Sequence, residues 1–144
     1  MPKPMILLVE DNDANRELVE DLLLAAGFEV AACPTGEEGM AWLETNRPDL
    51  ILMDINLPGQ DGASLTWQIR ARPDLVGVPV VAVTAYAMKG DSDRILAAGC
   101  DGYISKPIDV QRFPADVARF LGAGRSPSSL GPRPRAGRGA REER

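Results

Sequence analysis

The sequence predicts a single α/β domain whose core is a parallel β-sheet. Short apolar runs alternate with segments of helical periodicity, which is typical of repeated βα units. The runs are continuously rich in Val, Ile and Leu, as expected of parallel strands that are buried on both faces. A length of 144 residues is sufficient for one such domain and a short appendage.

Five apolar runs are candidates for the strands of this sheet. Polar or turn-forming residues follow each run and indicate where the strand ends. In chain order, the predicted strands lie at residues 5–9, 28–32, 50–53, 79–83 and 102–105.

The segment after the first strand predicts a helix over residues 13–26. Leu18, Leu22 and Leu23 recur there at helical spacing, so we expect them on the inner face of the helix. Gly27 follows as a stop signal, because glycine readily adopts the left-handed conformation that ends many helices.

The second helix is predicted to begin at the string TGEE, residues 35–38, which has the pattern of a capping box. It is expected to end near Asn46. A third helix covers about 62–71 and should bury Leu65 and Ile69, which are four residues apart.

The fourth helix is expected over 89–98, with Gly99 ending it. The last helix contains a proline, which removes a backbone hydrogen bond and clashes with the preceding turn inside a helix. We therefore expect residues 109–113 to form a separate turn, with Pro114 at the first helical position.

Composition changes sharply at Gly122. Residues 122–144 are rich in Gly, Pro, Ser and Arg and contain one large apolar residue, Leu130. Such a segment buries too little surface to offset the entropy lost on ordering. The sequence therefore predicts a folded domain over 1–121 and a disordered tail over 122–144, with no output domain of its own.

The charge is divided between these two parts. Residues 1–121 carry 10 basic and 19 acidic side chains, whereas residues 122–144 carry 6 Arg and 2 Glu. The acidic domain lacks the basic surface that general nucleic-acid binding requires. No apolar stretch approaches the roughly 20 residues of a membrane helix, and the start enters the first strand too early for a secretory signal.

The chain has two cysteines and no histidine. Cys33 and Cys100 have no metal-type spacing, and we expect two buried or half-buried thiols in a reducing cytoplasm. The absence of histidine excludes His-dependent triads and His-ligated zinc. It also means that a partner must supply any phosphohistidine.

Polar side chains follow four of the predicted strands. Glu10 and Asp11 follow the first strand, and Asp54 follows the third. Thr84 and Lys106 follow the fourth and the fifth. Because ligands bind just beyond the carboxyl ends of strands in open parallel sheets, these side chains predict a phosphoryl-accepting site built around Mg²⁺.

Asp54 is the candidate nucleophile, because an aspartate oxygen can attack phosphorus to form an acyl phosphate. We expect Asp11 and Asp54 to bind Mg²⁺ directly, Glu10 to bind it through water, and Asn56 to contribute its backbone carbonyl.

Two further residues would contact the phosphoryl oxygens, Lys106 as a compact charge and Thr84 through its hydroxyl. Each of these residues alone has an ordinary alternative, such as a solvated loop or a strand-end turn. Four of five strand ends that carry this set by chance are far less expected.

Four strings around these residues resemble receiver domains of two-component response regulators, most closely single-domain regulators of the DivK type. They are VEDN at 9–12, LILMDINLPGQDG at 50–62, VVAVTAYAMKGD at 80–91 and GYISKPID at 102–109. The resemblance implies a flavodoxin-like (βα)5 three-layer fold with strand order 2-1-3-4-5.

The same resemblance implies that Asp54 accepts phosphate from a sensor histidine kinase or histidine phosphotransfer protein. Thr84 would then follow the phosphate, and Tyr103 would swing inward as a switch. These movements would change the face of the fourth helix, fifth strand and fifth helix, where a downstream protein target would bind. The Lys106–Pro107 peptide would be cis.

Three features depart from the usual pattern of this family: Tyr86, Pro114 and the Arg-rich tail. A phosphatase of the haloacid-dehalogenase type is a competing interpretation, but its second acid would fall at Asn56, which cannot act as a general acid. A second alternative is tail-mediated contact with nucleic acid or a membrane surface through Arg125, Arg133, Arg135, Arg138 and Arg141. Dimerisation through the last helix stays open.

Overall fold

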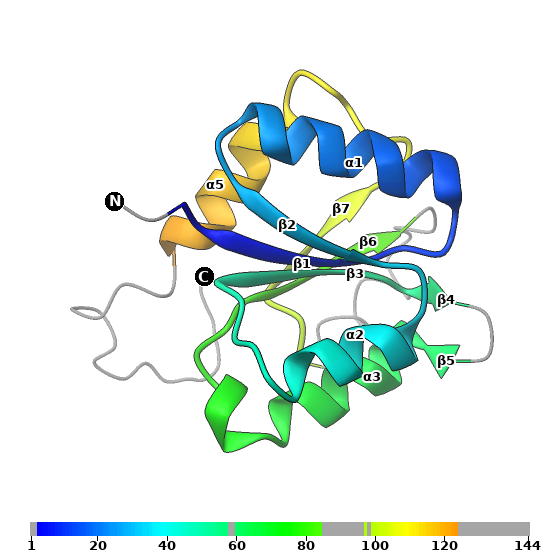
Figure 1. Cartoon of the computed structure of the whole chain (residues 1–144), viewed down its shortest axis with the longest axis vertical. Helices are drawn as coiled ribbons and strands as arrows, with labels where there is room; N and C mark the ends of the chain where they lie inside the picture. The colour runs from blue at the N-terminus through cyan, green and yellow to red at the C-terminus, as the bar shows by residue number, and fades with distance from the viewer. Residues whose placement is uncertain (1–2, 58–59, 85–96, 98, 124–144) are drawn as a thin grey trace.

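The computed structural model describes residues 3–57, 60–84, 97 and 99–123. Its centre is a five-stranded parallel sheet, shown edge-on in Figure 1. The five strands are β1 (Met5–Val9), β2 (Glu29–Cys33), β3 (Leu50–Asp54), β6 (Val80–Thr84) and β7 (Gly102–Ser105). All five predicted strands are thus confirmed to within one residue.

The strands are arranged in the order β2-β1-β3-β6-β7. Numbered in chain order among themselves, this is the expected order 2-1-3-4-5. Each neighbouring pair is parallel, so the carboxyl ends of all five strands lie at one edge. A short antiparallel hairpin that the sequence did not predict, β4 (Asn56–Leu57) with β5 (Gln60–Asp61), extends beyond β3 at that edge.

Helices cover both faces of the sheet and make three layers (Figure 1). One face carries α1 (Asp13–Ala25) and α5 (Phe113–Ala123), and the other carries α2 (Gly36–Leu43) and α3 (Gly62–Arg70). Side chains alternate between faces along each strand, as the pleat requires. The strands therefore supply apolar side chains to two separate cores.

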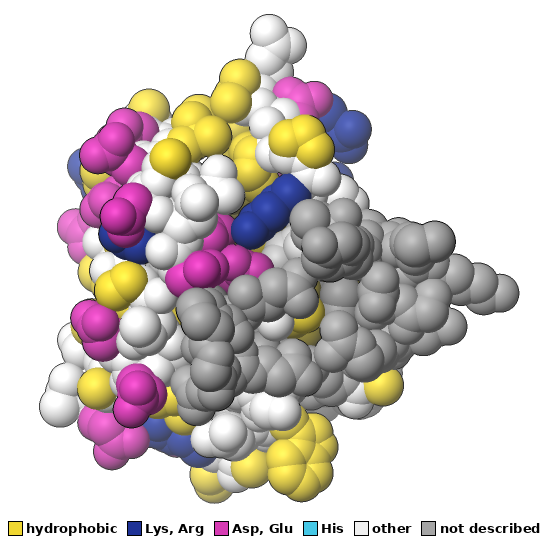
Figure 2. Space-filling model, turned by 90° about the vertical axis from the view of Figure 1, so that its right-hand side faces the viewer, with side chains coloured by type: hydrophobic (Ala, Val, Ile, Leu, Met, Phe, Trp, Pro, Cys, Tyr) yellow, Lys and Arg dark blue, Asp and Glu magenta, His cyan; other side chains and the backbone are white. Residues whose placement is uncertain are grey.

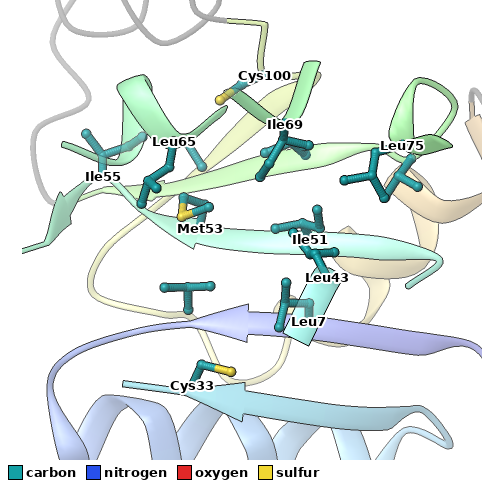
Figure 3. Packing of buried hydrophobic residues seen from close by; sticks show 14 residues of the cluster. Leu7, Cys33, Leu43, Ile51, Met53, Ile55, Leu65, Ile69, Leu75 and Cys100 are labelled. Carbon is teal, nitrogen blue, oxygen red and sulfur yellow. The ribbon is translucent and has the colours of Figure 1, made fainter. Parts of the chain in front are cut away.

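Figure 3 shows the core beneath α2 and α3. Leu7 and Ile51 come from neighbouring strands, and Leu43, Leu65 and Ile69 come from the two helices that cover them. The predicted burial of Leu65 and Ile69 is confirmed, since the two side chains are 1% and 0% exposed.

The first helix begins at Asp13, as predicted, and ends at Ala25, one residue before the predicted end. Asn12 is the N-cap, and its Oδ1 accepts a hydrogen bond from the Asn15 amide at 2.9 Å. The predicted inner position of Leu18 is wrong: its side chain is 39% exposed, whereas Val19 and Leu23 are buried. Val19 and Leu23 are four residues apart and lie on the face of α1 that packs against the sheet. Leu18 is one residue before Val19 and so lies about 100° away from it around the helix.

Two of the expected helix signals are confirmed, Gly27 after α1 and Thr35 before α2, whereas the helix that Gly99 is expected to end lies outside the described residues. Gly27 has a φ of +96° and Gly99 a φ of +107°, which is the conformation that favours glycine. The hydroxyl of Thr35 accepts from the Glu38 amide at 3.1 Å and caps α2. This helix ends at Leu43, three residues before the predicted end at Asn46.

The segment before α5 is a separate turn, as predicted. The Asp109 carboxylate accepts hydrogen bonds from the amides of Gln111 and Arg112, and the Asp109 carbonyl accepts from the Phe113 amide. The helix begins at Phe113, so Pro114 is its second residue and not its first. A proline is tolerated there because amides of the first turn have no partner inside the helix.

Two predicted segments lie outside the described residues: the fourth helix, apart from Ala97, and the tail from residue 124 onward. Tyr86 lies there as well. The last helix runs to Ala123, two residues past the boundary expected from composition. None of the helices in the described part of the chain is both long enough and apolar enough to span a membrane.

Candidate functional site

The carboxyl edge of the sheet brings the ends of β1 and β3 side by side. Val9 is paired with Met53 in the parallel register, so Glu10 and Asp54 lie at neighbouring strand ends. Both side chains are buried, with 3% of each residue exposed, whereas Asp11 is exposed. One oxygen of each of the three carboxylates lies within 4.8 Å of the other two.

Lys106 follows β7 and extends its amine into this group of acids. Its Nζ lies 3.1 Å from Glu10 Oε1 and 3.3 Å from Asp54 Oδ2. The backbone directs it there, because the Lys106 amide donates to the Thr84 carbonyl at 2.8 Å. The Lys106–Pro107 peptide is cis, as the resemblance implied.

The electrostatics of the site are unbalanced, with three carboxylates around one ammonium. Burial raises the pKa of Glu10 above its usual range, and the nearby Asp54 carboxylate adds to the rise, while the Asn12 amide and Lys106 oppose it. Burial alone would lower the pKa of Lys106, but the Asp54 and Glu10 carboxylates outweigh it and raise that pKa. Lys106 is therefore held as a cation.

These residues form a suitable site for a hard divalent cation. Mg²⁺ prefers carboxylate and water oxygens, and two of the three carboxylates come from a rigid sheet edge. Figure 2, which looks onto the carboxyl edge, shows acidic side chains gathered beside a basic one. A bound cation would offset the repulsion that Lys106 alone leaves uncompensated.

Thr84 and Tyr103, the two predicted switch residues, lie in different surroundings. Thr84 ends β6 and is 1% exposed, next to the backbone of Lys106. Tyr103 lies on β7 and is 37% exposed. Together with Pro107 and Phe113 it lines a cavity of about 330 Å³ between β7 and α5. None of the three clustered carboxylates lines this cavity. Asn56 begins β4, two residues after Asp54.

One residue next to the acids was not singled out from the sequence. Arg16 on α1 donates from Nη1 to the Glu10 carbonyl at 3.0 Å and from Nη2 to Asp13 Oδ1 at 2.6 Å. Its spacing from Asp13 suggests an ordinary helix pair, so the sequence carries no signal for the contact with Glu10.

Comparison with known proteins places these features in one family. Residues 6–118 match the response regulator receiver domain. The chain is 46% identical over 122 residues to the polar-differentiation response regulator DivK of Brucella anthropi. The matched region covers 85% of this chain and 98% of that relative.

Solved structures agree. A response regulator described as putative, from Chloroflexus aurantiacus, has a TM-score of 0.79 at 31% identity, covering 83% of this chain and 98% of its own. The receiver domain of a Pseudomonas aeruginosa sensor histidine kinase, with a magnesium ion coordinated in its active site cleft, has a TM-score of 0.78 at 37% identity, covering 85% and 100%. The resemblance seen in the sequence motifs is confirmed: this chain belongs to the response regulator receiver domain family.

Proposed function

We propose that this chain is a phosphorylation-controlled switch in which Asp54 accepts a phosphoryl group in the presence of Mg²⁺. The observation that carries the proposal is the group of three carboxylates within 4.8 Å of one another, with Lys106 Nζ at 3.3 Å from Asp54. A buried nucleophile beside a cation and a metal site is what phosphoryl transfer requires.

Asp11 and Asp54 are the direct metal ligands in this proposal, Glu10 binds through water, and Asn56 contributes its backbone carbonyl. The magnesium ion in the related Pseudomonas aeruginosa receiver domain supports the choice of metal. When bound, Mg²⁺ would neutralise charge on the carboxylates and on the incoming phosphoryl oxygens. The exposed position of Asp11 at the mouth of the site leaves room for water ligands.

In the transfer step, a carboxylate oxygen of Asp54 forms a bond to phosphorus as the bond to the donor breaks. The chain contains no histidine, so a phosphohistidine donor belongs to a sensor histidine kinase or phosphotransfer protein, whose imidazole is the leaving group. Lys106 pairs with the phosphoryl oxygens, and Thr84 donates its hydroxyl to one of them. The chain itself catalyses only its own phosphorylation and dephosphorylation.

The signal leaves the site through Tyr103 in this proposal. Its exposed side chain lines the cavity between β7 and α5, whereas Thr84 is buried one strand away. An inward swing of Tyr103 toward Thr84 would reshape that cavity and so change the surface offered to a downstream protein. The domain proposed to carry this switch covers residues 1–121.

The decisive test is incubation with acetyl phosphate and Mg²⁺, with the intact mass as the readout. We expect a single phosphoryl adduct in the wild type and none in Asp54→Asn. The matched control is Asp49→Asn, which changes an exposed aspartate just before the opposite end of β3 and should keep the adduct.

Removal of Mg²⁺ with a chelator should abolish the adduct in every variant. An adduct that persists in Asp54→Asn would move the acceptor to another residue. A folded wild type that gives no adduct with either acetyl phosphate or a phosphorylated kinase would contradict the proposed function.

A further inference from the structure

Arg16 is the one basic side chain on α1, and it contacts the segment that carries two of the acids. Its guanidinium bridges two acceptors, the Glu10 carbonyl at 3.0 Å and Asp13 Oδ1 at 2.6 Å. The side chain is 21% exposed, so most of it is packed against the protein. The two contacts hold the guanidinium in a fixed orientation, because it is a planar fork of donors.

The Glu10 carbonyl matters because it belongs to the peptide unit that carries Asp11. A peptide unit is planar, so fixing the direction of this carbonyl fixes the plane that leads to the Asp11 α-carbon. The other side of Glu10 is held as well, since its amide donates to the Cys33 carbonyl at 3.0 Å. Arg16 therefore fixes the backbone between the two acids.

The side chain of Glu10 is held by separate contacts. Its Oε2 accepts from the Asn12 amide at 3.1 Å, and its Oε1 lies 3.1 Å from Lys106 Nζ. Asp11 is exposed, and its position depends on the backbone that carries it. Among these contacts, the one from Arg16 acts on the peptide unit shared by Glu10 and Asp11.

We propose that Arg16 is a positioning residue for the Mg²⁺ site, which orients the Glu10–Asp11 peptide so that Asp11 faces the other two carboxylates. This inference rests on the proposed function, because it assumes that the acids bind Mg²⁺. Arg16 contacts no phosphoryl group in this role. It acts through the backbone of the ligands, as partners in the outer shell of a metal site do.

Charge and geometry predict opposite effects when Arg16 is replaced. The guanidinium is a cation close to a cation site, so its charge alone repels Mg²⁺ and its removal should tighten binding. If Arg16 instead positions Asp11, its removal should weaken binding, typically by about 10-fold or more for an outer-shell partner. The sign of the change therefore separates the two roles.

The experiment is a calorimetric titration with Mg²⁺ alone, on wild type, Arg16→Gln and Arg16→Lys, well below the unfolding temperature. We expect Arg16→Gln to bind Mg²⁺ about 10-fold more weakly than wild type. Arg16→Lys keeps the charge and one donor group, so it should recover part of the affinity. Phosphorylation of Arg16→Gln by acetyl phosphate should need a higher Mg²⁺ concentration than that of the wild type. At saturating Mg²⁺ its rate should be nearly that of the wild type.

The matched control is Arg119→Gln. Arg119 also pairs with an aspartate three residues before it, Asp116, at 3.3 Å, but lies on α5. We expect its Mg²⁺ affinity to equal that of the wild type. A structural effect of Arg16 alone would lower the unfolding temperature of the metal-free protein without changing the affinity of the folded protein.

Three outcomes overturn the inference. Arg16→Gln that binds Mg²⁺ as tightly as the wild type, or more tightly, removes the positioning role but leaves the proposed function intact. If Arg16→Gln does not fold, Arg16→Lys decides. The inference is overturned if Arg16→Lys binds Mg²⁺ as tightly as the wild type and needs no more Mg²⁺ for phosphorylation by acetyl phosphate. A wild type that does not bind Mg²⁺ at all removes both the inference and the metal part of the proposed function.

Discussion

Glu10 and Asp54 are buried carboxylates that share one lysine, and this arrangement would favour the binding of a further cation. A buried charge is destabilising unless it is paired and hydrogen-bonded. Lys106 reaches both acids, at 3.1 and 3.3 Å, but supplies one positive charge. The raised pKa of Glu10, caused mainly by burial, shows that folding disfavours its ionised form in the absence of a metal.

A second buried ionisable group lies away from the site and gives a prediction for high pH. Burial raises the pKa of Cys100 to about 12, from an ordinary value of 9.0. The folded protein therefore keeps a proton on Cys100 that the unfolded chain loses above pH 9. The contribution of this thiol to stability is complete below pH 9 and is lost as pH rises from 9 toward 12, by about 1.4 kcal/mol per pH unit.

Urea unfolding of the wild type and Cys100→Ala between pH 8 and pH 11 measures this effect, since alanine does not titrate. We expect the stability difference between the two proteins to narrow steadily above pH 9. Cys33 is present in both proteins, and so its own raised pKa cancels from the difference. Parallel pH profiles would show that Cys100 ionises as readily in the folded protein as in the unfolded chain.

Most of the site residues could be predicted from the sequence because their placement follows from the strand ends alone. The structure brings Glu10, Asp11, Asp54 and Lys106 together, as expected. Arg16 could not be predicted, because its acceptor is a backbone carbonyl and carries no residue-type signal. Leu18 was assigned wrongly because three leucines of similar spacing do not determine which side of the helix meets the sheet.

At the scale of elements, the close approach of α2 to β1 supports the position of Glu10. A Cβ at Gly39 on α2 would lie 2.8 Å from Val9 Cγ2, so the helix reaches this distance only with glycine there. Val9 is 1% exposed and β-branched, and it cannot easily turn away. It also directly precedes Glu10 in the chain.

We expect Gly39→Ala to destabilise the protein, although alanine favours helices by about 1 kcal/mol over glycine. Overpacking of a core costs about 1–3 kcal/mol, so the net loss should be about 1 kcal/mol. Gly77→Ala is the control, because a Cβ there would meet only Arg47 Nη2, at 3.5 Å. Urea unfolding is the measurement, and a more stable Gly39→Ala would mean that the helix can move away from β1.

The positions of the strands could be predicted from the sequence more accurately than the ends of the helices. The three central strands, β1, β3 and β6, could be located closely because they are buried along almost their whole length and are therefore apolar, with polar residues after them. The edge strands β2 and β7 are less buried and were located mainly from the turn-forming residues beside them. Helix ends were less certain: α2 is three residues shorter than predicted and α5 starts one residue early. The hairpin of β4 and β5 has two residues in each strand, which is too short to leave an alternating pattern.

At the scale of the whole molecule, Lys106 joins β7 to the ends of β1 and β3. We expect Lys106→Met to lower the metal-free stability by about 1–3 kcal/mol, since two buried carboxylates lose the hydrogen-bonding cation that they share. The same change removes a positive charge from the site and should increase the stabilisation by Mg²⁺. At a 100-fold excess over the dissociation constant, that stabilisation is about 2.7 kcal/mol in the wild type.

Thermal unfolding with Mg²⁺ and with a chelator measures both effects. Lys3→Met is the control, because Lys3 is exposed near the start of the chain, and it should leave both values unchanged. A Lys106→Met protein that is as stable as the wild type without metal would show that the two acids tolerate each other without the lysine.

Local patterns in the sequence are sufficient to predict the parallel α/β fold, the family and the kinds of residue at each strand end. These properties depend on local patterns: apolar runs, turn residues and short motifs. Which side chains come into contact depends on the packing of the whole chain. Lys106 contacts Asp54 from 52 residues away, and Tyr103 is partly exposed although Thr84 on the adjacent strand is buried. Such contacts depend on how strands and helices pack, and no local pattern records the distance between them.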